Sequence, residues 1–318
     1  MPYLAKFVMS QESVEQSTWL TDLELMHHYT SSTYMTLPRP EELHQLWQVE
    51  VPKVAMSHIY LLHQVLSISA HHLASSNPNR PEHSICASQH QNEAIKGLRT
   101  ALKSITEETC VEVFIASTLL SIGAFAGFST QKIQQQPRID DLLDVFVLLR
   151  GMKDILERFQ ATLHNSIIGA FFMKSHIIKP TPVLIHTLAQ LQEMTTPDDM
   201  DDEIAMLCRD SLTATVAWFQ NSISITRRPE ARIGMTWCLC VSPEFLDLIR
   251  RRHSFALCVV AYYCVILDHA GKSTWYMRGW GAAILQDIAN EVEPEWAEVV
   301  QWCLTAVQTN STLEAAHP

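Results

Sequence analysis

Glycine is scarce in this sequence, with 9 copies in 318 residues. That number leaves little material for the glycine-rich phosphate loops that connect strand to helix in nucleotide-binding α/β folds. The motifs GxGxxG, GxxxxGK(S/T) and GxSxG are absent from the whole chain. These absences argue against the common nucleotide-binding folds, and we expect the protein to work without a cofactor.

Basic residues are also in the minority. Lys and Arg together number 23 against 34 for Asp and Glu, which gives a formal net charge of −11. The summed field of such a chain repels a phosphate backbone, so direct nucleic-acid binding is not expected. The basic cluster Arg250–Arg252 precedes an apolar run and is typical of a solvated helix end.

Paired cysteines are missing as well. The 8 cysteines contain no CxxC pair and no regular spacing, and several lie within apolar runs. Isolated cysteines of this kind are typical of small core residues in a reducing compartment. They argue against a disulfide framework and against a cysteine-ligated zinc site.

Apolar runs are short for a membrane protein. The longest, Phe255–Leu267, falls below the roughly 18 to 20 residues that are needed to span a bilayer. The N-terminus has no uninterrupted apolar region followed by a small-residue cleavage site, which argues against secretion. We therefore expect a buried helix over this run and no membrane span.

Helical periodicity dominates the rest of the chain. With 47% hydrophobic residues and 8 Trp, the chain can bury a large core. We expect an all-α fold, a single domain of about ten helices that enclose a hydrophobic core or pocket. Its expected extent is residues 20–305, between an N-terminal extension over 1–19 and a C-terminal tail over 306–318.

Several helix boundaries are predicted from local signals. Thr21 and Glu24 fit a capping box at a helix start, and Pro38 and Pro40 break the chain after that helix. Helices are expected over residues 53–76, 84–105, 139–163, 182–194 and 201–223, and the segment from Ser242 is expected to continue into the apolar helix that ends near Leu267.

One stretch spells a DDxxD motif through Asp140, Asp141 and Asp144, the pattern with which class I terpene synthases hold magnesium. No second metal-binding arm of the (N/D)DxxSxxxE type follows. A helical wheel also turns Asp140 and Asp144 away from the apolar stripe. An acidic helix N-terminus is therefore favoured, and a metal site is kept as a minority alternative.

A set of aromatic and titratable residues could line a hydrophobic pocket. His58 and His72 fall on the apolar face of their helix, and two tyrosines lie next to a Trp-rich segment. Core packing is the alternative for each of them. The candidate ligand-binding residues are His58, His72, Tyr262, Tyr263, Asp268, Trp275 and Trp280.

Several longer segments occur in a recognisable order: DLELMHHYTSSTYMTL, LWQVEVPKVAMSHIYLLHQVLSISAHHLA, HQNEAIKGLRTAL, LLDVFVLLRGMKDIL, SPEFLDLIRRRHSFALCVVAYYCVIL and WYMRGWGAAILQDI. Together they resemble the C-terminal regulatory domain of fungal zinc-cluster (Zn2Cys6) transcription factors of the sterol uptake control type, over roughly residues 20–305. The family's zinc-cluster module, with its CxxCx6C repeats, is absent. Ser254 also stands where the family pattern usually has Pro, and Tyr262 where it often has His.

The resemblance implies a nuclear or cytoplasmic regulatory domain that binds a hydrophobic, sterol- or terpenoid-like ligand and forms a homodimer or a heterodimer with related regulators. The alternative is an enzyme of fungal specialised metabolism on the same fold. A cyclase, pericyclase or isomerase needs few catalytic residues because orientation of the substrate supplies much of the rate. In that case His58, His72, Tyr262 or Asp268 would donate or accept protons.

Overall fold

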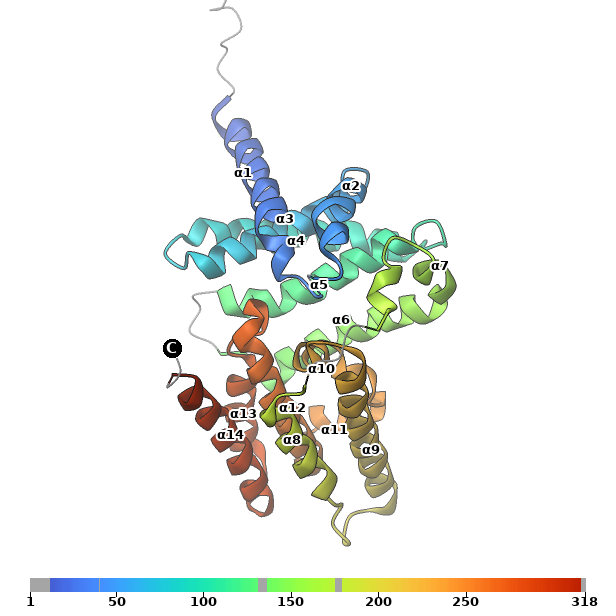
Figure 1. Cartoon of the computed structure of the whole chain (residues 1–318), viewed down its shortest axis with the longest axis vertical. Coiled ribbons are helices and arrows are strands. Elements are labelled where there is room, and N and C mark those ends of the chain that lie inside the picture. The colour runs from blue at the N-terminus through green and yellow to red at the C-terminus, as the bar shows by residue number, and fades with distance from the viewer. Residues whose placement is uncertain (1–11, 40, 131–135, 175–178, 316–318) are drawn as a thin grey trace, which may run out of the picture.

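The computed structural model describes residues 12–39, 41–130, 136–174 and 179–315 (Figure 1). These ranges contain fourteen α-helices and no β-strand. The predicted all-α fold class is confirmed, and the predicted number of about ten helices was too low. The boundaries of a domain over residues 20–305 stay a prediction.

The N-terminal half forms the upper layers of the molecule (Figure 1). Helix α3 lies in the middle of this half, between α1, α4 and α5. Pro81 occupies the first turn of α4, where its missing N–H costs nothing. The helices of this half are α1 (Glu12–Ser31), α2 (Val51–Ala55), α3 (Ile59–Ser76), α4 (Pro81–Leu102), α5 (Cys110–Thr130), α6 (Ile139–Arg158) and α7 (Gln160–His164).

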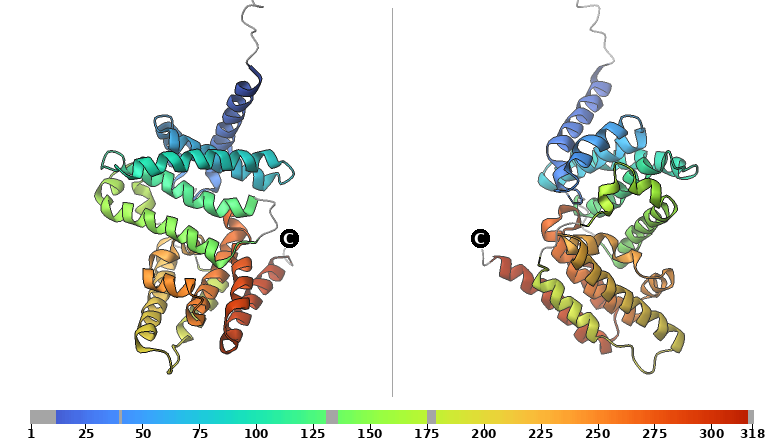
Figure 2. Two further views of the ribbon diagram at one scale, coloured as in Figure 1. Left: turned by 180° about the vertical axis from the view of Figure 1, so that it is seen from behind. Right: turned by 45° about the vertical axis from the view of Figure 1, so that its right-hand side comes forward.

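The C-terminal half is a bundle around α12, and α6 joins it to the upper layers (Figure 2). Sixteen residues of α12 are buried, because the helix is apolar on all sides and other helices surround it. The helices of this half are α8 (Pro182–Glu193), α9 (Asp202–Ile225), α10 (Pro229–Thr236), α11 (Pro243–Arg250), α12 (Ser254–Ser273), α13 (Trp280–Glu291) and α14 (Ala297–Ala315).

Two helices are long and apolar enough to cross a membrane by length and composition. They are α5, over Cys110–Phe128, and α12, over Ser254–Ser273. Inside the fold, 72% and 89% of these apolar windows are buried. That burial is what the core helices of a globular fold show, and it agrees with the buried helix expected over Phe255–Leu267.

Three predicted helix boundaries were wrong. Thr21 lies inside α1, which begins at Glu12, so the capping box does not form there. The helix expected over residues 53–76 is interrupted after Ala55, and His58 stands at the N-cap of α3 with an extended backbone. The segment from Ser242 does not continue into the apolar helix, because Arg252 has a φ of 61° and ends α11.

The end of α11 is a Schellman motif built without glycine. The N–H of His253 donates to the Leu248 carbonyl, and the N–H of Arg252 donates to the Ile249 carbonyl (both 3.0 Å). This pattern satisfies carbonyls that the last turn leaves open. A glycine usually supplies the left-handed residue, so the sequence carried no strong signal for this break.

Contacts between distant segments hold the two halves together. The indole Nε1 of Trp280 in α13 donates to the Phe125 carbonyl of α5 (3.0 Å). The two rings pack edge to face with centroids 5.0 Å apart. Gly281 follows Trp280 and allows α13 to lie directly against the backbone of α12. A single cluster of buried hydrophobic residues, whose members range in sequence from Tyr29 to Val307, extends through both halves.

Candidate functional site

A crevice of about 470 Å³ lies where the two halves meet. We call it the seam crevice. The N-terminal half contributes Met35, Thr36, His72, Ser75 and Ser76, which come from η2 (Thr33–Thr36) and the last two turns of α3. The C-terminal half contributes Arg228, Ser273, Trp275 and Arg278, which come from the segment before α10, the end of α12 and η6 (Trp275–Met277).

Trp275 connects the two halves across the seam crevice. Its Nε1 donates to the Thr36 hydroxyl (2.9 Å), although the two residues are 239 positions apart in sequence. The Thr36 hydroxyl in turn donates to the Thr33 carbonyl (2.7 Å). Trp275 is 8% exposed, and its ring lies against the His72 ring with centroids 5.3 Å apart. The crevice wall is thus built by residues of both halves.

The Nδ1 of His72 is within hydrogen-bonding distance of two side chains of the N-terminal half. That atom lies 3.1 Å from the Nε2 of His28 and 3.1 Å from the hydroxyl of Thr33. Burial and the neighbouring His28 lower the pKa of His72 to about 4, so the ring is neutral at neutral pH.

The serine hydroxyls of the crevice all donate to backbone carbonyls. Ser75 and Ser76 both donate to the His72 carbonyl (3.0 Å each), and Ser273 donates to the Ala270 carbonyl (3.3 Å). Their oxygen lone pairs therefore remain available as acceptors. Arg228 and Arg278 supply positive charge, and among the described residues no Asp or Glu lines the crevice.

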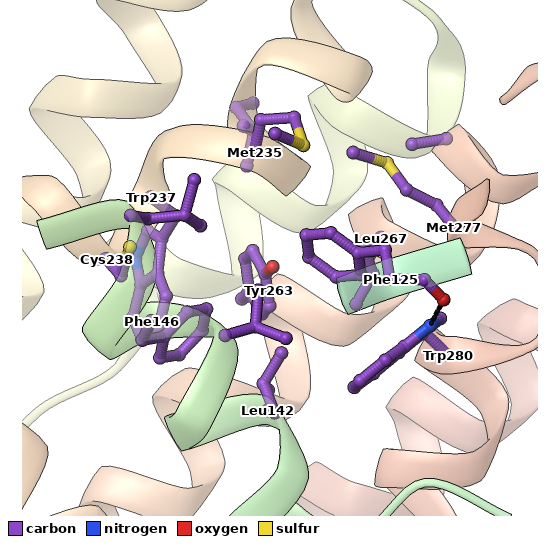
Figure 3. Packing of buried hydrophobic residues seen from close by; sticks show 14 of the residues in the cluster. Phe125, Leu142, Phe146, Met235, Trp237, Cys238, Tyr263, Leu267, Met277 and Trp280 are labelled. Carbon is purple, nitrogen blue, oxygen red and sulfur yellow. Dashed lines mark hydrogen bonds between the residues drawn. The ribbon is translucent and has the colours of Figure 1, made fainter. Parts of the chain in front are cut away.

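Tyr263 and Trp280, two of the predicted ligand-binding residues, are part of the packed core (Figure 3). The Tyr263 hydroxyl donates to the Gly234 carbonyl (2.7 Å), and its ring stacks on Trp237 with centroids 4.7 Å apart. Tyr262 is also buried and packs against Trp302. Burial raises the pKa of Tyr262 and of Tyr263, so both phenols stay protonated.

His58 and Asp268 lie apart from the seam crevice lining. The Nε2 of His58 is 3.7 Å from a carboxylate oxygen of Glu112. His58 precedes α3 and His72 lies in its fourth turn, so fourteen residues of helical rise, about 20 Å, separate them. Asp268 is half-buried on α12, where the backbone of Gly281 lies close to it. Of the seven candidates, the structure brings His72 and Trp275 together.

The three aspartates of the DDxxD stretch stand at the N-terminus of α6. Asp140 forms an ion pair with Arg252 (2.9 Å), and Asp141 accepts the backbone N–H of Arg138 (2.8 Å). Asp144 is exposed, on the polar face that the helical wheel predicted. Within the described parts of the chain, no three His, Cys, Asp or Glu side chains are gathered to hold a metal ion.

A second hollow, of about 820 Å³, runs between α1 and α4. Its lining includes a chain of three titratable side chains. The Nδ1 atoms of His63 and His90 are 2.9 Å apart, and the Nε2 of His90 is 3.2 Å from a carboxylate oxygen of Asp22. The sequence did not predict this chain, because its members lie on three different helices.

Arg228, Ser273 and Arg278 were also missed by the sequence analysis. Arg228 and Arg278 are in short connections before α10 and after η6, and Ser273 ends α12. No local motif marks any of them, because only tertiary packing brings these connections to the end of α3. The fold and the crevice together define an all-α protein of two helical halves with a ligand-sized hollow at their seam.

Residues 24–165 match the fungal specific transcription factor domain. The matched segment lies in the N-terminal half of the chain, and the predicted resemblance to fungal zinc-cluster regulators is confirmed. The match includes all five residues that the N-terminal half contributes to the seam crevice.

Three relatives carry related names. The Zn(2)-C6 fungal-type transcription factor afumD of Aspergillus fumigatus is 26% identical over 263 residues, which are 80% of this chain and 68% of that protein. A Zn(2)-C6 fungal-type transcription factor of Gibberella zeae is 25% identical over 336 residues, 93% of this chain and 65% of that protein. Sterol uptake control protein 2 of Candida albicans is 31% identical over 104 residues, which are 32% of this chain and 14% of that protein. The chain thus spans about two thirds of the first two relatives.

Proposed function

We propose that this chain is a transcription-regulatory domain controlled by a small molecule in the seam crevice. The observation that carries the proposal is the construction of the crevice from both halves, with the Trp275–Thr36 hydrogen bond across it. A ligand that contacts both halves binds one packing of the halves better than another and so shifts their equilibrium. Such a shift would expose or hide a surface for a partner of the transcription machinery, and the site of action would be the nucleus.

A hydrophobic ligand, sterol- or terpenoid-like, is the class that the family resemblance implies. Met35 and Trp275 supply apolar surface for it in the seam crevice. The core around Tyr263 and Trp280 is filled by protein side chains, and a ligand there would have to displace them. We therefore place the ligand in the crevice. The enzyme alternative is not favoured, because neither the buried Tyr262 nor His58 is among the described residues that line the seam crevice with His72.

The proposal is tested by filling the crevice. Ser273 is exposed at its rim, so Ser273→Trp fills the hollow without disturbing the core. Native mass spectrometry of protein from the fungal host is expected to show a bound small molecule for the wild type and none for Ser273→Trp. Transcript levels of the regulated genes are expected to change in the strain that carries Ser273→Trp.

Ser224→Trp is the matched control, because Ser224 is exposed on α9 and outside the crevice lining. It is expected to retain the bound molecule and the wild-type transcripts. A wild-type protein without any bound molecule, together with unchanged transcripts in the Ser273→Trp strain, would show that the crevice has no regulatory role.

We also propose that α1 mediates homodimer formation. Helix α1 projects from the rest of the fold (Figure 1). Trp19, Leu20 and Leu23 of this helix are 61%, 57% and 51% exposed, and their i, i+3 and i, i+4 spacing puts them on one face. Single exposed apolar residues are normal, but three adjacent ones including Trp form a patch typical of interfaces. A second copy can bury the same face about a two-fold axis.

The double variant Trp19→Ser, Leu23→Ser is therefore expected to halve the molar mass found by light scattering. Met206→Ser removes a similarly exposed apolar side chain from α9 and is expected to keep the wild-type mass. Identical masses for the wild type and the double variant would contradict a dimer through α1.

A further inference from the structure

We propose that the ligand of the seam crevice is a small hydroxylated organic acid, whose carboxylate binds Arg228 and Arg278. This inference rests on the proposed function, since it assumes that the crevice binds a small molecule, and it adds the chemical class. It departs from the uncharged, largely apolar ligand that the family resemblance implies.

The charge of the crevice is the first argument. The chain carries a net charge of −11, yet the described lining of the crevice contains two arginines and no carboxylate. Arg228 donates to Glu41 (3.0 Å), and both side chains of this pair are close to half exposed. An exposed pair of this kind contributes about 0 to 1 kcal/mol, so a ligand carboxylate can compete for Arg228 or share it. Arg278 also has an interaction within the fold, but its side chain is exposed, so a ligand carboxylate would share its N–H donors. A guanidinium has five N–H donors and suits a carboxylate better than any uncharged group.

The serine hydroxyls are the second argument. Because the protons of Ser75, Ser76 and Ser273 point to backbone carbonyls, these oxygens offer acceptors to a ligand. A carboxylate cannot donate to them, but a hydroxyl group on the same ligand can. The crevice therefore matches a ligand with both an anionic group and hydroxyl donors.

The C-terminal end of α3 determines the expected orientation of the ligand in the crevice. Ser75 and Ser76 belong to the last turn of α3, where the helix dipole places partial negative charge. That end repels a carboxylate and favours a hydroxyl donor. The arginines lie on the C-terminal half, so the acid group faces Arg228 and Arg278 while the hydroxyl groups face α3.

The size and apolar surface of the crevice favour a compact, flat body. Its volume of about 470 Å³ lies toward the lower end of the range of roughly 300 to 1,000 Å³ for ligand sites. Trp275 and Met35 provide apolar contact for one aromatic ring, and the neutral His72 ring lies beside Trp275. A hydroxylated benzoic acid has these features, and 2,4-dihydroxybenzoate is a suitable probe.

Calorimetric titration of the full chain with 2,4-dihydroxybenzoate tests the inference. We expect binding to the wild type, at least tenfold weaker binding of the methyl ester, and weaker binding of benzoate, which lacks the hydroxyl groups. Arg278→Gln is expected to weaken binding of the acid at least tenfold. Arg227→Gln is the matched control, since Arg227 is exposed and outside the crevice lining, and is expected to bind like the wild type.

The outcomes separate this inference from the proposed function. If the methyl ester binds as tightly as the acid and Ser273→Trp abolishes both, the crevice is a ligand site and the acid class is wrong. Ergosterol binding to the wild type that is lost in Ser273→Trp would also show that the crevice is a ligand site and that the acid class is wrong. Equal affinity of the acid for Arg278→Gln and the wild type, or no binding of the acid at all, also overturns the acid class. Native mass spectrometry of the wild type and Ser273→Trp then tests independently whether the crevice binds a small molecule.

Discussion

Gly281→Ala is expected to lower the free energy of unfolding by about 3 kcal/mol, the upper range for overpacking a core by one methyl group. A Cβ at this position would lie 2.4 Å from the Asp268 nitrogen and 2.4 Å from the Cys264 carbonyl oxygen. Both atoms belong to the backbone of α12, which is buried on all sides and cannot move aside as a side chain could. The methyl group therefore has to push α13 away from α12. Urea unfolding followed by circular dichroism measures the loss.

Gly151→Ala is the matched control for this substitution. Gly151 is exposed in the middle of α6, and a Cβ there would meet no atom within 4 Å. Because alanine favours a helix over glycine by about 1 kcal/mol, this variant is expected to be more stable than the wild type. Two glycine-to-alanine changes in helices thus have opposite expected signs. Similar stabilities of the two variants would show that α12 and α13 are not in rigid contact at Gly281.

The fold class could be predicted from the sequence because helical periodicity is a local property. The apolar stripe of α6 and the exposed Asp140 and Asp144 follow directly from spacing. The breaks between helices were harder, since they depend on single backbone angles. Arg252 adopts a left-handed conformation that glycine usually supplies, and His58 caps α3 without a side-chain hydrogen bond. Neither residue type is a strong signal for a helix boundary.

The candidate site could be predicted only in part. His72, Tyr263, Trp275 and Trp280 were predicted to bind a ligand, and that role stays a prediction; His72 and Trp275 line the seam crevice, whereas Tyr263 and Trp280 are buried in the core. Helical phase does not say whether a ring faces a packed neighbour or a hollow. Trp280 meets Phe125, whereas Trp275 borders the seam crevice. The distinction arises from contacts between segments as far apart as Thr36 and Trp275, which no local pattern encodes.

Mild acid is expected to destabilise the N-terminal half because its helices enclose neutral histidines. His71 on α3 is buried, and its Nε2 lies 3.2 Å from the Gln91 side-chain oxygen of α4. Burial lowers the pKa of His71 to about 4, although the hydrogen bond to Gln91 acts in the opposite direction. Burial also lowers the pKa values of His28, His72 and His90, which lie on α1, α3 and α4.

The sign of the pH dependence follows from proton binding. In the unfolded chain His71 has a pKa near 6.5, so between about pH 6.5 and 4 the unfolded state binds a proton that the folded state does not. The stability contributed by the neutral ring is present above pH 6.5 and is lost as the pH falls toward 4. For His71 alone the expected loss between pH 7.5 and pH 5 is about 2 kcal/mol. His28, His72 and His90 add losses of the same sign.

Urea unfolding at pH 7.5, 6 and 5 measures this loss, and His71→Gln isolates the contribution of one residue. Glutamine does not titrate in this range and can donate a hydrogen bond to Gln91 in place of the imidazole. We expect the difference in stability between pH 7.5 and pH 5 to shrink by about 2 kcal/mol in His71→Gln. His27→Gln, at an exposed position of α1, is the control and is expected to keep the wild-type difference. If the two variants show the same pH dependence, the buried ring of His71 is not what makes the N-terminal half sensitive to acid.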